Sequence, residues 1–319
     1  METYRLAGTD LTVSKLCLGA MALGAVQDER TSFAILDRFV EAGGTFIDTA
    51  NNYMFWLDGH TGDESELMLG RWLAARGNRE DVVVASKVGW RPTTVGGGLD
   101  DAEHLTAQRI GAAIDESLAR LGTDYLDLYW THRDDRDVGL AETVAGMAAT
   151  VTAGKARAIG ASNHTAWRVS EARALAPDTV RYVAMQNRYS YLQPRPGVKL
   201  AESGHVHATS DTLDFVAATE DMALLTYTAL LYGSYTRDDK PLSPQYVHPG
   251  TEARLQVLDE VATETGATRN QVVLAWLCGH PGPVIPLVGV SSVSQLDEVI
   301  DGVNLKLSAE QWRRLSDAA

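Results

Sequence analysis

The stretch FIDTANNY, at residues 46–53, joins an apolar segment to a polar loop. Phe46 and Ile47 run directly into Asp48, and Tyr53 follows five residues later. We expect Asp48 at the end of a buried strand and Tyr53 on the loop that leaves it. A carboxylate and a phenol held close together at a strand end are typical of a proton donor with tuned acidity.

Strand-like and helix-like segments alternate along the chain on both sides of this stretch. Segments such as 30–42 and 108–121 have the apolar spacing of helices, and helical segments separate each predicted strand from the next. Uninterrupted alternation indicates a parallel sheet. Eight units in 319 residues favour a closed (β/α)8 TIM barrel over an open doubly wound sheet, and no linker divides residues 1–319 into domains. The predicted strands span residues 15–19, 45–48, 81–87, 125–130, 156–160, 182–186, 223–227 and 284–286.

Long loops follow three of the predicted strands, at residues 88–104, 188–210 and 228–250. In a barrel these loops lie at the C-terminal face, where the active sites of such folds are built. Long loops in a compact domain usually carry function. We therefore expect the functional site at this face.

The composition narrows the classes of partner. A net charge of −14 disfavours nucleic acid and anionic membranes. No apolar run is long enough for a membrane helix, and the N-terminus lacks the apolar stretch of a signal peptide, so we expect a cytoplasmic protein without a membrane partner. The two cysteines, Cys17 and Cys278, lie in apolar runs and do not indicate a disulfide framework. Nothing in the sequence indicates an oligomeric state.

Polar side chains stand at the ends of three neighbouring predicted strands. Asp48 ends the second strand, Lys87 ends the third, and His132 follows the fourth. Each has an ordinary explanation alone: Asp48 can cap the next segment, Lys87 can be a surface charge, and a lone histidine is often structural. In a closed barrel they would surround one mouth together with Tyr53, and coincidence explains four such residues poorly.

These four side chains suit proton transfer to a carbonyl oxygen. A free tyrosine has a pKa of ~10, and an adjacent lysine ammonium lowers that pKa by stabilising the phenolate. Asp48 would keep Lys87 charged and positioned, and His132 would orient the carbonyl by a hydrogen bond. General acid–base help of this kind contributes roughly 10²–10⁴-fold to the rate, and a reduction also needs a hydride donor.

The sequence motifs around these residues resemble those of the aldo-keto reductase family. They follow the order that the family has, along nearly the whole chain. The resemblance implies a (β/α)8 barrel that binds a nicotinamide cofactor without a Rossmann fold and reduces an aldehyde or ketone, a small-molecule carbonyl substrate, to an alcohol. It also implies that Tyr53 donates the proton, Lys87 lowers its pKa, Asp48 pairs with Lys87, and His132 orients the carbonyl. The matching motifs are FIDTANNY (46–53), VASKVG (84–89), LDLYWTHRDD (126–135), GKARAIGASNH (154–164) and MQNRYSYL (185–192), with weaker matches at LGAM (18–21), YTALLYGSYTR (227–237) and VGVSSVSQL (288–296).

The same resemblance implies a set of cofactor-binding residues. The set includes groups that hold the nicotinamide carboxamide, an aromatic ring that stacks on the nicotinamide, and two loops that cover the pyrophosphate and the adenosine end. Taken alone, the serine and asparagine of the carboxamide group could cap a helix, and the glutamine could satisfy buried backbone. The carboxamide group is Ser162, Asn163 and Gln186, the stacking ring is Tyr227, the pyrophosphate loop holds Thr228, Leu230, Gly233 and Arg237, the adenosine loop holds Gly289, Ser291 and Gln295, and Met21 and Asp48 complete the set.

The chain departs from the family pattern in the last cofactor loop. Many relatives carry an arginine after the glycine of this loop, where it grips the 2′-phosphate of NADP. Here Gly289 is followed by Val290, Ser291 and Ser292, and no basic residue comes before Lys306. NADPH is the first expectation on family grounds, and NADH is the alternative.

A second departure lies directly after Tyr53. Eleven residues separate Tyr53 from Ser65-Glu66, where the family usually has only a few. Large aromatic side chains on such loops often line binding pockets. We expect Phe55, Trp56, Trp90 and Trp130 to shape a pocket for a bulky or ring-shaped carbonyl substrate.

Other functions compete with carbonyl reduction. One is a redox-sensing, cofactor-binding regulatory subunit with little turnover, which the intact set of four residues disfavours. Another is a Schiff-base aldolase with Lys87 as nucleophile, which leaves the tyrosine, asparagine and glutamine pattern unexplained. The motif His205-Val206-His207 could indicate a metal site, but it lies in a long polar loop, so we expect no metal.

Overall fold

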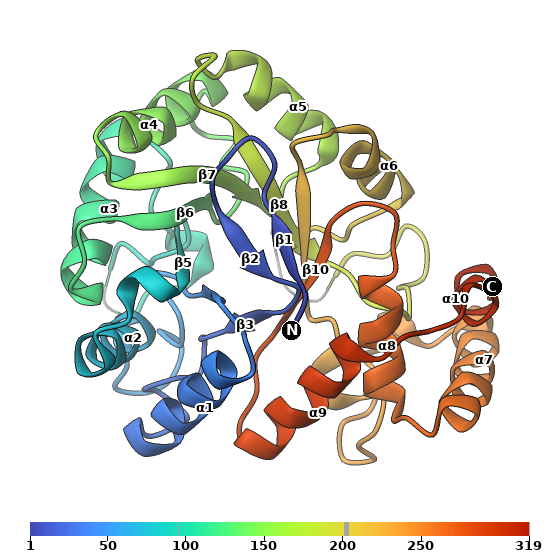
Figure 1. Cartoon of the computed structure of the whole chain (residues 1–319). Helices are drawn as coiled ribbons and strands as arrows, with labels where there is room; N and C mark the ends of the chain where they lie inside the picture. Colours follow the sequence, from blue (N-terminus) through green and yellow to red (C-terminus); the bar gives the residue numbers. More distant parts are fainter. Residues whose placement is uncertain (95, 201–203, 319) are drawn as a thin grey trace.

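The computed structural model describes residues 1–94, 96–200 and 204–318. Eight parallel strands close into a barrel in the order β10-β3-β4-β5-β6-β7-β8-β9 (Figure 1). The predicted TIM barrel and its eight strands are confirmed. The predicted loops 88–104 and 188–210 include residue 95 and residues 201–203, which lie outside the described ranges. The strands are β3 (Cys17–Gly19), β4 (Phe46–Asp48), β5 (Val83–Val88), β6 (Leu126–Thr131), β7 (Ala156–Ser162), β8 (Tyr182–Arg188), β9 (Ala223–Tyr227) and β10 (Val284–Val288).

Helices surround the barrel and bury its outer face (Figure 1). Two helices, α7 and α8, connect β9 to β10, and the last helix, α10, packs against α7. None of the helices in the described ranges is long and apolar enough to cross a membrane. The helices are α1 (Glu29–Glu41), α2 (Glu64–Arg76), α3 (Ala107–Leu121), α4 (Leu140–Thr152), α5 (Ala166–Leu175), α6 (Ser210–Ala218), α7 (Pro249–Thr265), α8 (Arg269–Cys278), α9 (Val293–Asn304) and α10 (Ala309–Asp317).

A short antiparallel hairpin lies across the end of the barrel where the strands begin (Figure 1). Its strands are β1 (Thr3–Arg5) and β2 (Thr12–Ser14), and neither is among the predicted strands. Leu6, Leu11 and Val13 join the apolar cluster that fills the barrel interior. The hairpin therefore closes the end opposite the site.

The barrel interior includes a residue that we expected in the substrate pocket. Trp130 is fully buried in the inner cluster, next to Lys87 in the register between β5 and β6. A Cβ atom added to Gly160 would lie 2.3 Å from Cζ3 of Trp130. Trp130 thus packs onto the bare backbone of the neighbouring strand β7, where Gly160 is its register partner, and its role in shaping a substrate pocket stays a prediction. Because side chains alternate along a strand, Trp130 points inward below His132.

We predict that Gly160→Ala lowers the free energy of unfolding by about 1–3 kcal/mol, because the added methyl group overlaps a rigid buried ring. Denaturant unfolding measures the change. Gly111→Ala is the matched control, since it sits inside α3 and, outside its own helical turn, no described residue lies within 4 Å of the added Cβ. The control should stabilise the protein by about 0.5–1 kcal/mol. Equal stabilities for Gly160→Ala and the wild type would contradict this packing.

Candidate active site

A buried ion pair occupies the C-terminal ends of β4 and β5. Asp48 ends β4, Lys87 lies in β5, and both side chains are fully buried and in direct contact. Lys87 Nζ also donates to the Thr49 carbonyl at 2.7 Å and contacts the Tyr53 hydroxyl at 2.7 Å. These three partners account for the three donors of the ammonium group. The expected convergence of aspartate, lysine and tyrosine is therefore present.

Burial decides the protonation preferences of this pair. Burial raises the pKa of Asp48, against the opposing effect of Lys87 and of the Gln186 hydrogen bond. Burial likewise lowers the pKa of Lys87, against the opposing effect of Asp48. Burial thus pushes each group toward its neutral form, and the charge of its partner is the main influence that holds it charged.

The pKa of the Tyr53 phenol differs from the expectation. Burial, with the Asp48 carboxylate as the next cause, raises its pKa well above the ordinary value, whereas we expected Lys87 to lower it. The Tyr53 hydroxyl lies 3.4 Å from Asp48 Oδ2, so the carboxylate offsets much of the positive charge of Lys87. Tyr53 is therefore protonated at neutral pH, which is the form that a proton donor needs.

His132 completes the set of four residues. It directly follows β6, and its ring centroid lies 6.0 Å from that of Tyr53 and 4.8 Å from that of Trp90. Burial, followed by the positive charge of Lys87 and then by His205, lowers its pKa well below the ordinary value. The imidazole is therefore neutral, and its N–H can donate one hydrogen bond to a carbonyl oxygen.

The three residues expected at the carboxamide lie together at the ends of β7 and β8. Ser162 donates to the Gln186 carbonyl at 3.0 Å, and Gln186 Nε2 donates to Asp48 at 3.2 Å. Asn163 has left-handed backbone with φ 58°, and its Nδ2 donates to the His132 carbonyl at 3.0 Å. This group is thus joined directly to Asp48 and His132.

The side-chain oxygen of Asn163 is already bonded within the chain. It accepts from the Tyr227 hydroxyl at 2.6 Å and from the Val206 amide at 3.1 Å. A bound carboxamide would have to exchange with one of these partners. Asn163 still fits the role, because its side chain offers both an acceptor oxygen and an NH2 donor.

Val206 and His205 are residues of the site that the sequence did not assign. The segment that carries them pairs with the end of β8, where the Arg188 amide donates to the Val206 carbonyl at 2.9 Å. The His205 ring centroid lies 5.3 Å from Trp90 and 5.4 Å from Tyr227. The HVH motif was visible in the sequence, but only the long loop after β8 carries it back to the mouth of the barrel.

The remaining cofactor candidates line the loops after β9 and β10. Thr228 has φ 55°, and Leu230 accepts the Gly233 amide at 2.9 Å in the turn that follows. Arg237 packs on Gly233 and pairs with Asp239 at 2.6 Å. These residues form a compact loop beside Tyr227.

The loop after β10 leads into the N-terminus of α9. The Ser291 amide and hydroxyl donate to Gln295 at 2.8 Å and 2.9 Å, and Ser292 caps the helix. A Cβ atom on Gly19 would lie 3.4 Å from the Gly289 amide, so the backbones of β3 and this loop approach closely. Met21, which follows β3, is 38% exposed. A helix N-terminus in such a place suits a phosphate group.

The aromatic residues expected at the substrate lie on two loops. Trp90 borders a cavity of about 330 Å³ that also reaches Arg133, Asp134 and Asn163. Phe55 and Trp56 pack edge to face with ring centroids 5.2 Å apart, and Trp56 is 52% exposed. Trp90 therefore contacts His132 directly, whereas Trp56 is an exposed side chain on the loop after Tyr53.

The ion pair generates a stability prediction. Lys87→Met leaves Asp48 buried without a counter-charge, which we expect to cost about 3–5 kcal/mol at pH 7. The folded-state pKa of Asp48 would rise further above its unfolded value, so stability should fall as pH increases. Urea unfolding at pH 5 and pH 8 measures this.

The double variant Asp48→Asn/Lys87→Met is the control, because it removes both charges. It should recover most of the lost stability and show little dependence on pH in this range. A double variant less stable than Lys87→Met, or an equal loss at both pH values, would contradict the interpretation.

Comparisons with known proteins agree with this geometry. Residues 15–319 match the Aldo/keto reductase family. The uncharacterized oxidoreductase YrpG of Bacillus subtilis (strain 168) is 33% identical over 322 residues, covering 99% of this chain and 95% of the relative. Norsolorinic acid reductase stcV of Emericella nidulans is 32% identical over 337 residues, covering 98% of this chain and 79% of the relative.

A solved structure supports the same assignment. The crystal structure of the thermostable aldo-keto reductase Tm1743 in complex with the inhibitor epalrestat superposes with a TM-score of 0.77. The two sequences are 26% identical, and the match covers 100% of both chains. Fold, family match and relatives agree, and the chain therefore belongs to the aldo/keto reductase family of oxidoreductases.

Proposed function

We propose that this chain reduces an aldehyde or ketone to an alcohol with NAD(P)H, with Tyr53 as the proton donor. The contact that carries the proposal is the 2.7 Å approach of Lys87 Nζ to the Tyr53 hydroxyl, beside buried Asp48. Tyr53 is protonated before the reaction because its pKa is raised. Once the proton has left, the adjacent ammonium group stabilises the phenolate.

His132 is proposed to orient the substrate carbonyl. Its ring lies edge to face with the Tyr53 ring, with centroids 6.0 Å apart, and close to Trp90. A neutral imidazole can donate one hydrogen bond to the carbonyl oxygen while the phenol donates its proton to the same atom. Two donors aimed at one oxygen also stabilise the negative charge that develops there.

Four residues are proposed to hold the nicotinamide, which supplies the hydride when bound. Ser162, Asn163 and Gln186 offer the amide and hydroxyl groups, and Tyr227 offers an aromatic face. NADPH is our first proposal, on the ground of the family resemblance. The absence of basic residues between Gly289 and Lys306 makes NADH the alternative, and KM values for the two cofactors separate them.

The substrate is proposed to be a bulky or ring-shaped carbonyl compound. The cavity beside Trp90 combines one aromatic wall with polar groups of Arg133 and Asp134, which suits a ring that bears oxygen substituents. The name of the Emericella nidulans relative indicates that it acts on norsolorinic acid, and this supports testing such compounds. Phe55 and Trp56 would close the outer edge of the pocket.

Tyr53→Phe tests the proposed reaction. We expect kcat to fall by roughly 10²–10⁴-fold, because general acid catalysis is lost. The Kd of the cofactor should change little, since the hydroxyl and not the ring is removed. Steady-state oxidation of NADPH and cofactor fluorescence titration measure the two quantities. No turnover of the wild-type protein with a broad panel of aldehydes and ketones would instead favour a cofactor-binding regulatory subunit.

Trp56→Ala tests the role of the segment after Tyr53. We expect kcat/KM for ring-shaped ketones to fall, while small aliphatic aldehydes react as before, because only large substrates reach the outer edge of the pocket. Trp167→Ala is the control, since Trp167 is a similarly exposed tryptophan on α5. Unchanged kcat/KM across the panel for Trp56→Ala would contradict this role.

A further inference from the structure

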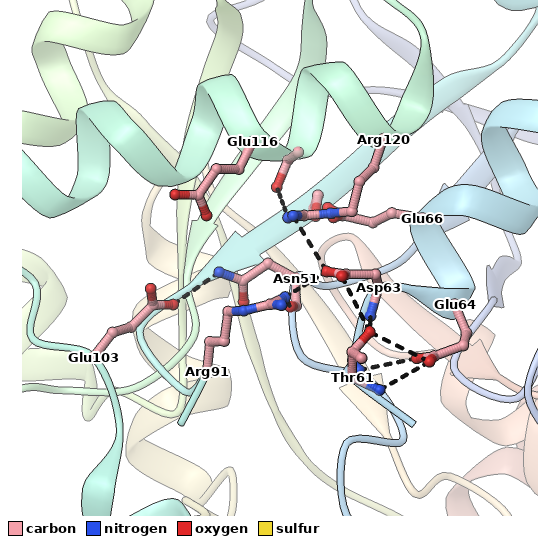
Figure 2. Close-up of polar contacts among 12 residues, drawn as sticks. Asn51, Thr61, Asp63, Glu64, Glu66, Arg91, Glu103, Glu116 and Arg120 are labelled. Carbon is pink, nitrogen blue, oxygen red and sulfur yellow. Dashed lines mark hydrogen bonds and ion pairs between the residues drawn. The ribbon is translucent and has the colours of Figure 1, made fainter. Parts of the chain in front are cut away.

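We propose that Arg91 is a positioning residue that holds the Tyr53 loop in its reactive place. This inference rests on the proposed function of Tyr53. Arg91 Nη1 donates to the backbone carbonyl of Asn51 at 2.5 Å and to Asp63 Oδ1 at 2.6 Å (Figure 2). Asn51 precedes Tyr53, and Asp63 ends the segment that follows it. One nitrogen atom thus joins the two ends of the loop that carries the proton donor.

The loop after β5 makes further contacts with Asn51 and its neighbour Asn52. Asn51 Nδ2 donates to Glu103 Oε1 at 2.8 Å, and Asn52 Nδ2 donates to the Trp90 carbonyl at 2.9 Å. The Glu103 carboxylate is buried and also accepts the Gly89 amide at 2.9 Å. The segment before Tyr53 is therefore fastened to the chain on both sides of Arg91.

Asp63 connects this arrangement to the helices outside the barrel (Figure 2). Arg120 of α3 lies 3.2 Å from Asp63 and 2.6 Å from Glu66. Glu66 in turn accepts the Ser86 hydroxyl at 2.5 Å, and Ser86 directly precedes Lys87. The segment after Tyr53 and the strand that carries Lys87 are thus held by one network of charged groups.

Geometry explains why this network matters for the reaction. The Tyr53 hydroxyl must keep its 2.7 Å contact with Lys87, and the Tyr53 backbone is in a loop and not in a strand. A displacement of ~1 Å in such a contact can cost on the order of 10²-fold in rate. Arg91 and Asp63 are partly exposed, at 22% and 26%, so their pair contributes less to folding than a buried pair does.

The ordinary alternative is that the pair only stabilises the fold. It predicts a lower melting temperature with unchanged kcat per folded molecule. The positioning role predicts the opposite: a lower kcat, an unchanged cofactor Kd, and a small thermal shift. The two roles therefore differ in which measured quantity moves.

The experiment compares Arg91→Gln and Arg91→Lys with a matched surface control, Arg71→Gln. Arg71 pairs with Glu29 on the outside of the barrel, where both side chains are at least half exposed. We expect Arg91→Gln to lower kcat by roughly 10–100-fold. Arg91→Lys should recover most of kcat, because one ammonium can donate to both Asn51 and Asp63. The control should keep wild-type kcat.

A readout that needs no turnover separates this inference from the proposed function. Tyrosine labelled with 13C at Cζ reports the Tyr53 phenol by NMR, and its resonance is assigned by its loss in Tyr53→Phe. Arg91→Gln should shift that resonance and its titration midpoint, whereas Arg71→Gln should not. An unmoved resonance, or equal kcat losses in Arg91→Gln and the control, would overturn the inference. A shifted resonance in a protein that reduces no carbonyl compound would overturn only the proposed function.

Discussion

The buried pair of Lys87 and Asp48 is the constraint on which the site depends. Removing two charges from water costs several kcal/mol per ion, and the cost is offset only where hydrogen bonds satisfy the remaining donors and acceptors. Lys87 meets this condition through Thr49 and Tyr53, and Asp48 through Gln186. The barrel supplies the positions, because neighbouring parallel strands end at one face.

The pair also sets the protonation of its neighbours. Burial, with Lys87 as the next cause, keeps His132 neutral, and burial, with Asp48 as the next cause, keeps Tyr53 protonated. Our expectation from sequence considered the lysine alone and predicted a lowered tyrosine pKa. The aspartate lies close to the same hydroxyl, so the two charges largely offset one another there and burial dominates.

Features that arise from a local sequence pattern could be predicted, whereas features without such a pattern could not. The eight strands and the convergence of Asp48, Lys87 and His132 follow from periodicity and from the order of strands. The hairpin strands β1 and β2 were not predicted, because strands of three residues are too short to show a periodicity. The place of Trp130 could have been inferred, since it lies two residues before His132 and therefore on the same face of the strand.

Other features left no signal in the sequence. Arg91 and Asp63 are 28 positions apart, on loops whose approach depends on the finished barrel. Val206 reaches Asn163 across 43 positions by pairing with the end of β8. Neither contact follows from residue type or spacing, because loop backbones of this length have many conformations.

The segment after Tyr53 combines a fixed base with an exposed tip. At its base, a Cβ atom on Gly62 would lie 2.9 Å from the Cα of Asn52, and φ 91° at Gly62 disfavours any other residue. At its tip, Trp56 is 52% exposed and contacts Phe55. Residues at the tip can therefore change without moving the base. Under the proposed function, this separates the choice of substrate at the tip from the proton transfer at Tyr53, whose contact with Lys87 stays the same.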